Sequence, residues 1–267
     1  MRRIDLLSRT LRLAVAAAGV AAIVAIATIT VRAGTFGTRC QKSFQDPKLK
    51  TLSYQYVRCG GFNSELDDSD TKVFYYNLKG GSGFTSSDGS AGAGGVDSVD
   101  LFYVATHGGA WDDPFAAVLA LYHQDATTDS TMWRFGNNSR TVKIFSQYAC
   151  DTLRLTNGWN RWAAAFKGGL YIATGSHDTL YDGTTTDETG EDYADDLQDG
   201  KSVKWAWFDG NGDWYADQDV AVYASSSGPL GECQFRRDWM TWQNVATFPR
   251  LRDDDMNRIC ASWISDN

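Results

Sequence analysis

The sequence predicts an α/β fold in which helices cover a mostly parallel β-sheet. Three segments have the pattern of strands, 99–105, 141–148 and 169–174, and the near-continuous apolar run of the first is typical of a strand that is buried on both faces. A segment with helical spacing, 157–167, separates the second strand from the third. Because a strand, a helix and a strand in succession form a crossover connection, we expect these two strands to be parallel.

The helix at 157–167 is predicted by the spacing of its apolar side chains. Four of them recur at positions i, i+3, i+4 and i+7, which lie on one face of a helix: Trp159, Trp162, Ala163 and Phe166. Asn157 can cap the start of this helix and Gly168 its end. We therefore expect the helix to pack its apolar face against the sheet.

The other segments give less regular patterns. They predict a strand at 73–78, a loop rich in glycine and serine at 80–95, a short helix at 190–200 and a late strand at 220–225. Residues 115–122 fit a helix and a strand equally well. No internal repeat or linker is evident after residue 33, so residues 34–267 are expected to form a single domain.

The first 33 residues have the three parts of a secretory signal peptide. Four arginines precede residue 13, an apolar run rich in alanine and valine follows to residue 29, and Val31-Arg32-Ala33 offers a cleavage site. The run is close to the shortest length that spans a bilayer, so an uncleaved anchor is the alternative. We expect an exported microbial protein that is secreted, periplasmic or held in the cell envelope, with no other membrane contact.

Composition and charge exclude two classes of protein. Hydrophobic residues make up 43% of the chain, which excludes a disordered protein. The chain has 33 acidic and 25 basic residues, and cleavage after residue 33 removes five arginines and one aspartate, leaving a net charge of −12. A nucleic-acid partner is not expected, because its phosphates would require clustered lysines and arginines that the sequence lacks.

The five cysteines predict two disulfide bonds and one free thiol in an oxidising compartment. Cys40 and Cys59 lie near the start of the mature chain, and Cys233 and Cys260 lie near its end. Cys150 lies alone in the middle. Of the three ways to pair the outer four cysteines, we predict the two that join neighbours in sequence, which leaves Cys150 free.

Each of the three apolar strands is followed by a residue that can take part in catalysis: His107, Cys150 and His177. Ligands of doubly wound sheets bind at the carboxyl ends of the strands. A cysteine attacks as its thiolate, and a nearby imidazole can accept its proton. Gly108 leaves room for its backbone N–H to reach a substrate oxygen, and the N–H of Cys150 can be the second oxyanion donor. We therefore predict a catalytic dyad of His107 and Cys150.

Three neighbouring residues are weaker candidates for a substrate pocket. Ser176 and His177 end the third strand, and His177 fits a structural or surface role as well. Asp151 could bind a cationic side chain, but it fits the cap of a turn better.

Residues 209–219 have the spacing of a calcium-binding loop. Oxygen ligands are expected at loop positions 1, 3, 5, 7 and 9, which here are Asp209, Asn211, Asp213, Tyr215 (through its carbonyl) and Asp217. Two positions depart from the motif, because Trp214 replaces glycine and Val220 replaces glutamate. A solvated turn before a strand is the alternative. The predicted chemistry requires no cofactor, and calcium is the ion that this loop would bind.

An apolar strand that ends in His-Gly, followed by an apolar strand that ends in Ala-Cys, resembles the caspase, legumain, gingipain and clostripain group of cysteine peptidases. The match runs from Leu101 to Gly108 and from Val142 to Cys150, and the histidine precedes the cysteine by 43 positions. The resemblance covers about residues 97–208. It is closest to secreted microbial relatives of that fold.

The resemblance implies a caspase-like three-layer sandwich and a secreted cysteine endopeptidase that hydrolyses a peptide or protein substrate. It implies that Cys150 attacks the scissile carbonyl while His107 polarises it or acts as general acid. Residues 34–95 depart from the group, because they are too short and glycine-rich to predict its opening strand–helix–strand unit. No residue maps onto the pocket that selects the substrate side chain. The alternative function is a catalytically silent secreted domain that uses this fold for binding and is stabilised by calcium.

Overall fold

The structure is a computed structural model, and it describes residues 34–66, 72–77, 96, 99–109, 118–120, 125–127, 142–167, 169–212, 218–248, 256 and 258–265. The predicted export segment and the glycine-rich stretch 80–95 lie outside the described residues. Within the described ranges, no helix is long and apolar enough to cross a membrane.

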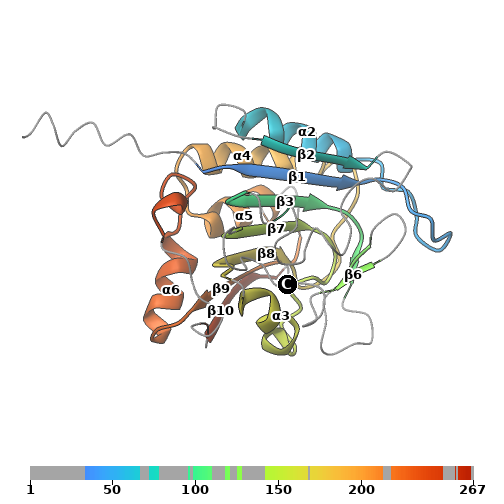
Figure 1. Cartoon of the computed structure of the whole chain (residues 1–267). Coiled ribbons are helices and arrows are strands. Elements are labelled where there is room, and N and C mark those ends of the chain that lie inside the picture. The colour runs from blue at the N-terminus through green and yellow to red at the C-terminus, as the bar shows by residue number, and fades with distance from the viewer. Residues whose placement is uncertain are drawn as a thin grey trace, which may run out of the picture. The chain divides into compact units, whose positions relative to one another are not determined.

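A mostly parallel β-sheet forms the centre of the fold (Figure 1). Among the described residues it has seven strands, in the order β10 (Arg258–Ile264), β9 (Val220–Ser226), β8 (Ile172–Ser176), β7 (Ile144–Tyr148), β3 (Leu101–Ala105), β1 (Phe36–Gln41) and β2 (Lys72–Asn77). Neighbouring strands from β8 to β2 are parallel, whereas β9 is antiparallel to both β8 and β10. The predicted parallel arrangement of β3, β7 and β8 is therefore confirmed.

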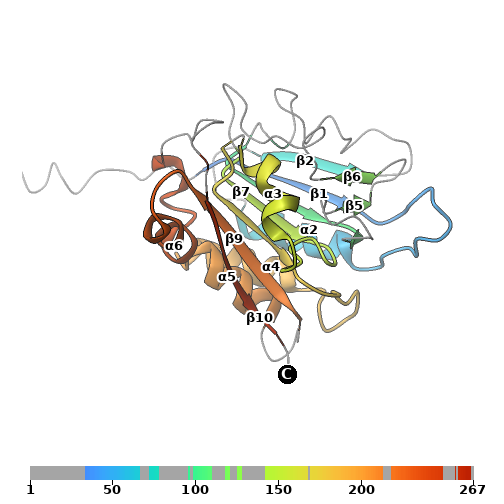
Figure 2. The same cartoon turned by 90° about the horizontal axis from the view of Figure 1, so that it is seen from below.

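Helices cover both faces of this sheet. The described α-helices are α2 (Gln55–Glu65), α3 (Gly158–Lys167), α4 (Thr189–Gln198), α5 (Val203–Gly212) and α6 (Leu230–Trp239). Figure 2 shows α3 in front of the sheet, with α2, α4 and α5 behind it. The predicted helices at 157–167 and 190–200 correspond to α3 and α4, and the predicted strands at 73–78 and 220–225 to β2 and β9.

Two apolar cores lie on opposite faces of the sheet. Alternate residues of β3 point to different cores: Tyr103 packs with Tyr193 of α4, while Phe102 belongs to the core that contains Trp162 of α3. This alternation follows from the period of two along a strand. It also explains why the sequence of β3 is apolar throughout.

A second, smaller sheet follows β3. Strand β4 (Gly108–Gly109) pairs antiparallel with β5 (Val118–Ala120), and β5 pairs with β6 (Asp125–Thr127). The described part of the ambiguous segment 115–122 is therefore a strand.

The expectation that residues 34–95 lack a strand–helix–strand unit was wrong, because β1, α2 and β2 form one. All six residues of β1 are buried, but Thr38 and Arg39 are polar, so the strand has no apolar pattern in the sequence. Gly61 of α2 is required for close packing, since a Cβ atom there would lie 2.7 Å from the Cβ of Glu191 in α4. Gly61 thus allows α2 and α4 to pack closely, whereas the glycine content of residues 34–95 had argued against a strand–helix–strand unit there.

The predicted cysteine pairing is confirmed. Cys40 of β1 is bonded to Cys59 of α2, and Cys233 of α6 is bonded to Cys260 of β10. Cys150 is free. Two disulfide bonds are compatible with an exported protein.

Candidate active site

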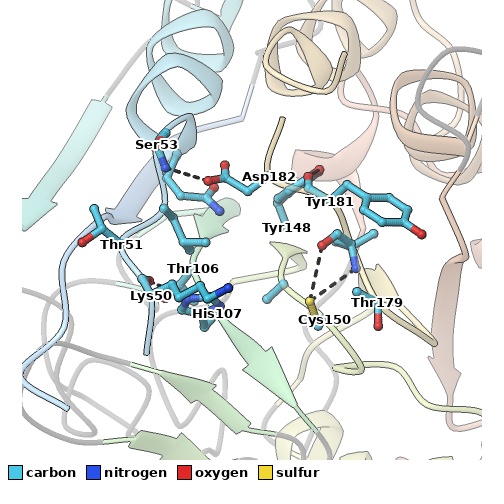
Figure 3. A pocket seen from close by; sticks show the side chains of 14 residues that line it. Lys50, Thr51, Ser53, Thr106, His107, Tyr148, Cys150, Thr179, Tyr181 and Asp182 are labelled. Atoms are coloured by element: carbon cyan, nitrogen blue, oxygen red, sulfur yellow. Dashed lines mark hydrogen bonds between the residues drawn. The ribbon is translucent and has the colours of Figure 1, made fainter. Parts of the chain in front are cut away.

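His107 and Cys150 follow two neighbouring strands at the same edge of the sheet. Ala105 of β3 is opposite Tyr148 of β7 in their parallel pairing, so each candidate residue lies two positions beyond this pair. The backbone N–H of Thr106 donates to the carbonyl oxygen of Tyr148 at 3.1 Å, which extends the ladder toward the site. Both His107 and Cys150 line one pocket of about 550 Å³ (Figure 3). The two residues thus line the same pocket at this edge of the sheet, and their action as a dyad stays a prediction.

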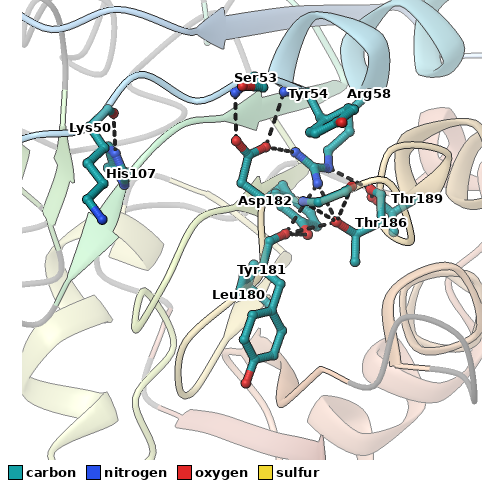
Figure 4. Close-up of polar contacts among 12 residues, drawn as sticks. Lys50, Ser53, Tyr54, Arg58, His107, Leu180, Tyr181, Asp182, Thr186 and Thr189 are labelled. Carbon is teal, nitrogen blue, oxygen red and sulfur yellow. Dashed lines mark hydrogen bonds and ion pairs between the residues drawn. The ribbon is translucent and has the colours of Figure 1, made fainter.

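The imidazole of His107 is held by a backbone carbonyl. Its Nε2 atom lies 2.8 Å from the carbonyl oxygen of Lys50 (Figure 4). Since a carbonyl oxygen only accepts hydrogen bonds, Nε2 carries a proton and donates it in this contact. The ring of Phe44 lies 4.9 Å from the imidazole, centroid to centroid. These two contacts fix the orientation of the His107 imidazole.

The thiol of Cys150 lies against the backbone of Leu180. The N–H of Leu180 donates to Sγ at 3.3 Å, and Sγ lies 3.7 Å from the carbonyl oxygen of the same residue. Burial is the main cause that raises the pKa of the Cys150 thiol, and the nearby carboxylates of Asp151 and Asp178 raise it further. At neutral pH the group is therefore a thiol that needs a base before it can attack.

Asp182 joins the two walls of the pocket. One wall is formed by residues 50–55 and the other by residues 179–182. The carboxylate of Asp182 accepts hydrogen bonds from the backbone N–H groups of Ser53 and Tyr54, at 2.6 and 3.2 Å (Figure 4). These two groups immediately precede helix α2, so Asp182 satisfies donors at its start.

Arg58 of α2 fastens the loop that carries Asp182. Its side chain is completely buried and donates to the Asp182 carboxylate at 2.8 Å, to the carbonyl oxygens of Tyr181 and Thr186, and to the Thr186 hydroxyl. The guanidinium group also lies 4.1 Å from the ring centre of Tyr148. This arrangement ties the wall at 179–182 to both α2 and β7.

The position of Gly108 excludes any side chain. A Cβ atom there would lie 2.4 Å from the carbonyl oxygen of Cys150 and 2.8 Å from the Cβ of Ala149. The chain after β3 therefore passes directly against the chain after β7. Gly108 was expected to leave room for its N–H to reach a substrate oxygen, whereas the close contact in the structure is with the backbone of Cys150 itself.

The three weaker pocket candidates lie outside the described pocket wall. Asp151 pairs with Arg154 at 3.2 Å, which matches the expected role in a turn. The hydroxyl of Ser176 contacts the carbonyl oxygens of Asp178 and Asp219, and Nε2 of His177 lies 2.9 Å from the carbonyl oxygen of Ile264. Ser176 and His177 thus stabilise chain turns and the end of β10 rather than the pocket.

The structure describes part of the predicted calcium loop. Asp209 and Asn211 belong to the last turn of α5, whereas Asp213, Tyr215 and Asp217 lie outside the described residues. Asp209 forms an ion pair with Lys201 at 2.9 Å, and the Oδ1 atom of buried Asn211 has no hydrogen-bond partner in the described part of the chain. The described residues contain no group of three or more side chains suited to a metal ion. Calcium binding stays a prediction.

Calcium binding by residues 209–219 is expected to raise the melting temperature. A ligand that binds only the native state at 100 times its Kd adds about 2.7 kcal/mol of stability, which is roughly 5–10 °C for a chain of this size. Differential scanning calorimetry with millimolar calcium, and then with excess chelator, measures this shift. Magnesium at equal concentration and the Asp217→Asn variant are the controls. An unchanged melting temperature would identify the segment as an ordinary turn.

The residues around His107 and Cys150 were not predicted from the sequence. Lys50, Gln55, Leu180 and Asp182 all line the pocket, and none belongs to a motif. The available signal was the Asp-Gly pair at 182–183, which indicates a turn soon after β8.

Comparison with known families gives one finding. A family model described as a domain of unknown function (DUF6345) matches residues 41–249. This range contains every residue of the described pocket wall. Comparison with the curated proteins finds no match.

Proposed function

The chain belongs to the DUF6345 family, and we propose that it is an exported cysteine endopeptidase with a caspase-like fold and a dyad of His107 and Cys150. One observation carries the proposal: the histidine and the cysteine follow adjacent parallel strands and line one pocket. The mostly parallel sheet with helices on both faces and the two disulfide bonds also support it. Its substrate is a peptide or protein.

The proposed reaction begins with proton transfer from the Cys150 thiol to Nδ1 of His107. The sulfur then forms a bond to the carbonyl carbon of the scissile peptide, and the carbonyl oxygen becomes negatively charged. Backbone N–H groups of Gly108 and Cys150 are the proposed donors to this oxyanion, and one such donor contributes roughly 3–4 kcal/mol to the transition state. The C–N bond breaks as His107 returns the proton to the leaving amine. Water then hydrolyses the thioester, which releases a carboxylic acid and regenerates the thiol.

The raised pKa of Cys150 decides how the thiolate is generated in this proposal. A thiol whose pKa lies above its ordinary value is almost fully protonated at pH 7, so a preformed thiolate is not the attacking species. The base supplied by His107 is therefore essential.

Peptide-library cleavage by the mature protein tests the proposal. We expect Cys150→Ala and His107→Ala each to lower kcat/KM by roughly 1,000-fold or more, since the members of a nucleophile–base pair act as a unit. His177→Ala is the matched control, because this histidine lies outside the pocket and should leave cleavage unchanged. Equal cleavage by wild type and Cys150→Ala would contradict the proposal.

The second candidate function is a catalytically silent binding domain. The observation that favours it is the burial of the Cys150 thiol against Leu180, which lowers its reactivity. In that case wild type cleaves no peptide and Cys150 resists iodoacetamide at pH 7.5, although the folded protein still binds peptides. Rapid alkylation of Cys150 that slows in the His107→Ala variant would instead favour the enzyme.

A further inference from the structure

The Cys40–Cys59 bond closes the segment that supplies one wall of the pocket. The two cysteines belong to β1 and α2, with a sequence separation of 19. Residues 42–54, between the strand and the helix, form turns and no regular element, and Leu52 is the only one of them that is buried. This segment therefore has little apolar packing of its own to fix its position.

Both described contacts of the His107 imidazole come from this segment. The carbonyl oxygen of Lys50 accepts the hydrogen bond of Nε2, and the ring of Phe44 lies 4.9 Å from the imidazole, centroid to centroid. Residues 50–53 also line the pocket. A displacement of the segment would thus free the His107 ring and alter the pocket wall at the same time.

The disulfide bond restricts the motion available to residues 42–54. A cross-link lowers the entropy of the open chain between its ends, so local opening of the segment becomes less favourable. Cys40 is 1% exposed and Cys59 is 0% exposed. Thiol–disulfide exchange requires access to a sulfur atom, so a reductant in solution reaches this bond poorly while the protein is folded. The bond therefore persists once it has formed.

We propose that the Cys40–Cys59 bond switches the active site on after export. In the reducing cytoplasm both cysteines stay thiols, so the segment at 42–54 is not held and His107 lacks its fixed orientation. After export, the two thiols transfer two electrons and two protons to the disulfide of a thiol oxidase, which becomes a dithiol, and the bond forms. The inference rests on the proposed peptidase function and adds its regulation, because the peptidase stays inactive inside the cell that makes it.

The first test removes each disulfide bond of the mature protein in turn. Cys40→Ser/Cys59→Ser should lower kcat/KM roughly 100-fold, with the larger part of the loss in kcat, because His107 is misplaced. Cys233→Ser/Cys260→Ser is the matched control. It opens a longer loop, with a separation of 27 instead of 19, so it should cost at least as much global stability, yet neither cysteine lines the pocket. Its kcat/KM should equal that of wild type, and equal losses in the two variants would overturn the inference.

Refolding makes the same comparison without replacing Cys40 or Cys59. The Cys233→Ser/Cys260→Ser protein is unfolded with a reductant and refolded either with the reductant or with oxidised glutathione. A short treatment with dilute reductant then frees the Cys150 thiol in both samples, whereas the buried bond persists. Bond formation should raise kcat/KM roughly 100-fold, while circular dichroism shows a folded chain in both samples. Equal activity, or a reduced sample that does not fold, would overturn the inference.

A signal that needs no peptidase activity separates this inference from the function on which it rests. The imidazole nitrogen chemical shifts, measured by NMR, report which ring nitrogen carries the proton, and His107→Ala assigns the signals of His107. We expect the proton to be fixed on Nε2 in wild type and in the control, and to be shared between the two nitrogens in Cys40→Ser/Cys59→Ser. If wild type cleaves no peptide, the proposed function fails. Identical shifts in all three proteins would then refute the effect of the bond on His107, and the expected difference would support it.

Discussion

Under the proposed peptidase function, a Gly108→Ala variant is expected to lose roughly 100-fold in kcat/KM, because displacements of about 1 Å at a reacting site have effects of this size. The added Cβ would lie 2.4 Å from the carbonyl oxygen of Cys150 and 2.8 Å from the Cβ of Ala149. Both neighbours belong to the chain after β7, so the segments that carry His107 and Cys150 must move apart. Steady-state kinetics on the best peptide substrate measures the loss.

The control for Gly108→Ala is Gly60→Ala. A Cβ at position 60 meets no atom within 4 Å, and the residue lies in helix α2, where alanine is favourable. Its activity should equal that of wild type, and its melting temperature should not fall. Wild-type kinetics in Gly108→Ala would show that the close approach of the two segments has no part in catalysis.

An Arg58→Met variant is expected to lose about 3 kcal/mol of unfolding free energy, the lower end of the range for breaking a buried ion pair. Methionine keeps most of the volume but removes every hydrogen bond that the guanidinium donates. The carboxylate of Asp182 and the carbonyl oxygens of Tyr181 and Thr186 would then each lose the buried donor that Arg58 supplies. Urea unfolding followed by tryptophan fluorescence measures the change.

Arg154→Met is the matched control for this second variant. Its partner is also an aspartate, Asp151, but the Arg154 side chain is 45% exposed, whereas that of Arg58 is 0% exposed. Exposed ion pairs contribute at most about 1 kcal/mol. Equal losses in the two variants would mean that the buried contacts of Arg58 do not stabilise the native protein.

The fold was predictable where both faces of a strand are apolar, as in β3. This strand contributes to the apolar cores on both sides of the sheet, so burial leaves a continuous apolar run in the sequence. The same logic failed for β1, whose buried residues include Arg39 and Gln41. Edge strand β10 was also missed, because its residues alternate irregularly between buried and exposed.

The candidate site was predictable only for residues at strand ends. A shared location of His107 and Cys150 could be predicted, since parallel neighbouring strands end at one edge of the sheet. Gln55 and Asp182 come from segments 127 positions apart in the chain, and no local pattern relates them. The two residues line one pocket because the hydrogen bonds of Arg58 fix the loop after β8, and these bonds are a property of tertiary packing.

The fastening of both pocket walls has a thermodynamic consequence for binding. The segment before α2 is tied to the scaffold by the Cys40–Cys59 bond and by Asp182, and the segment after β8 is tied by Arg58. The backbone entropy of these walls is therefore lost when the chain folds, not when a ligand arrives. A peptide that enters such a preorganised pocket loses mainly its own freedom, so even a few contacts can yield measurable affinity.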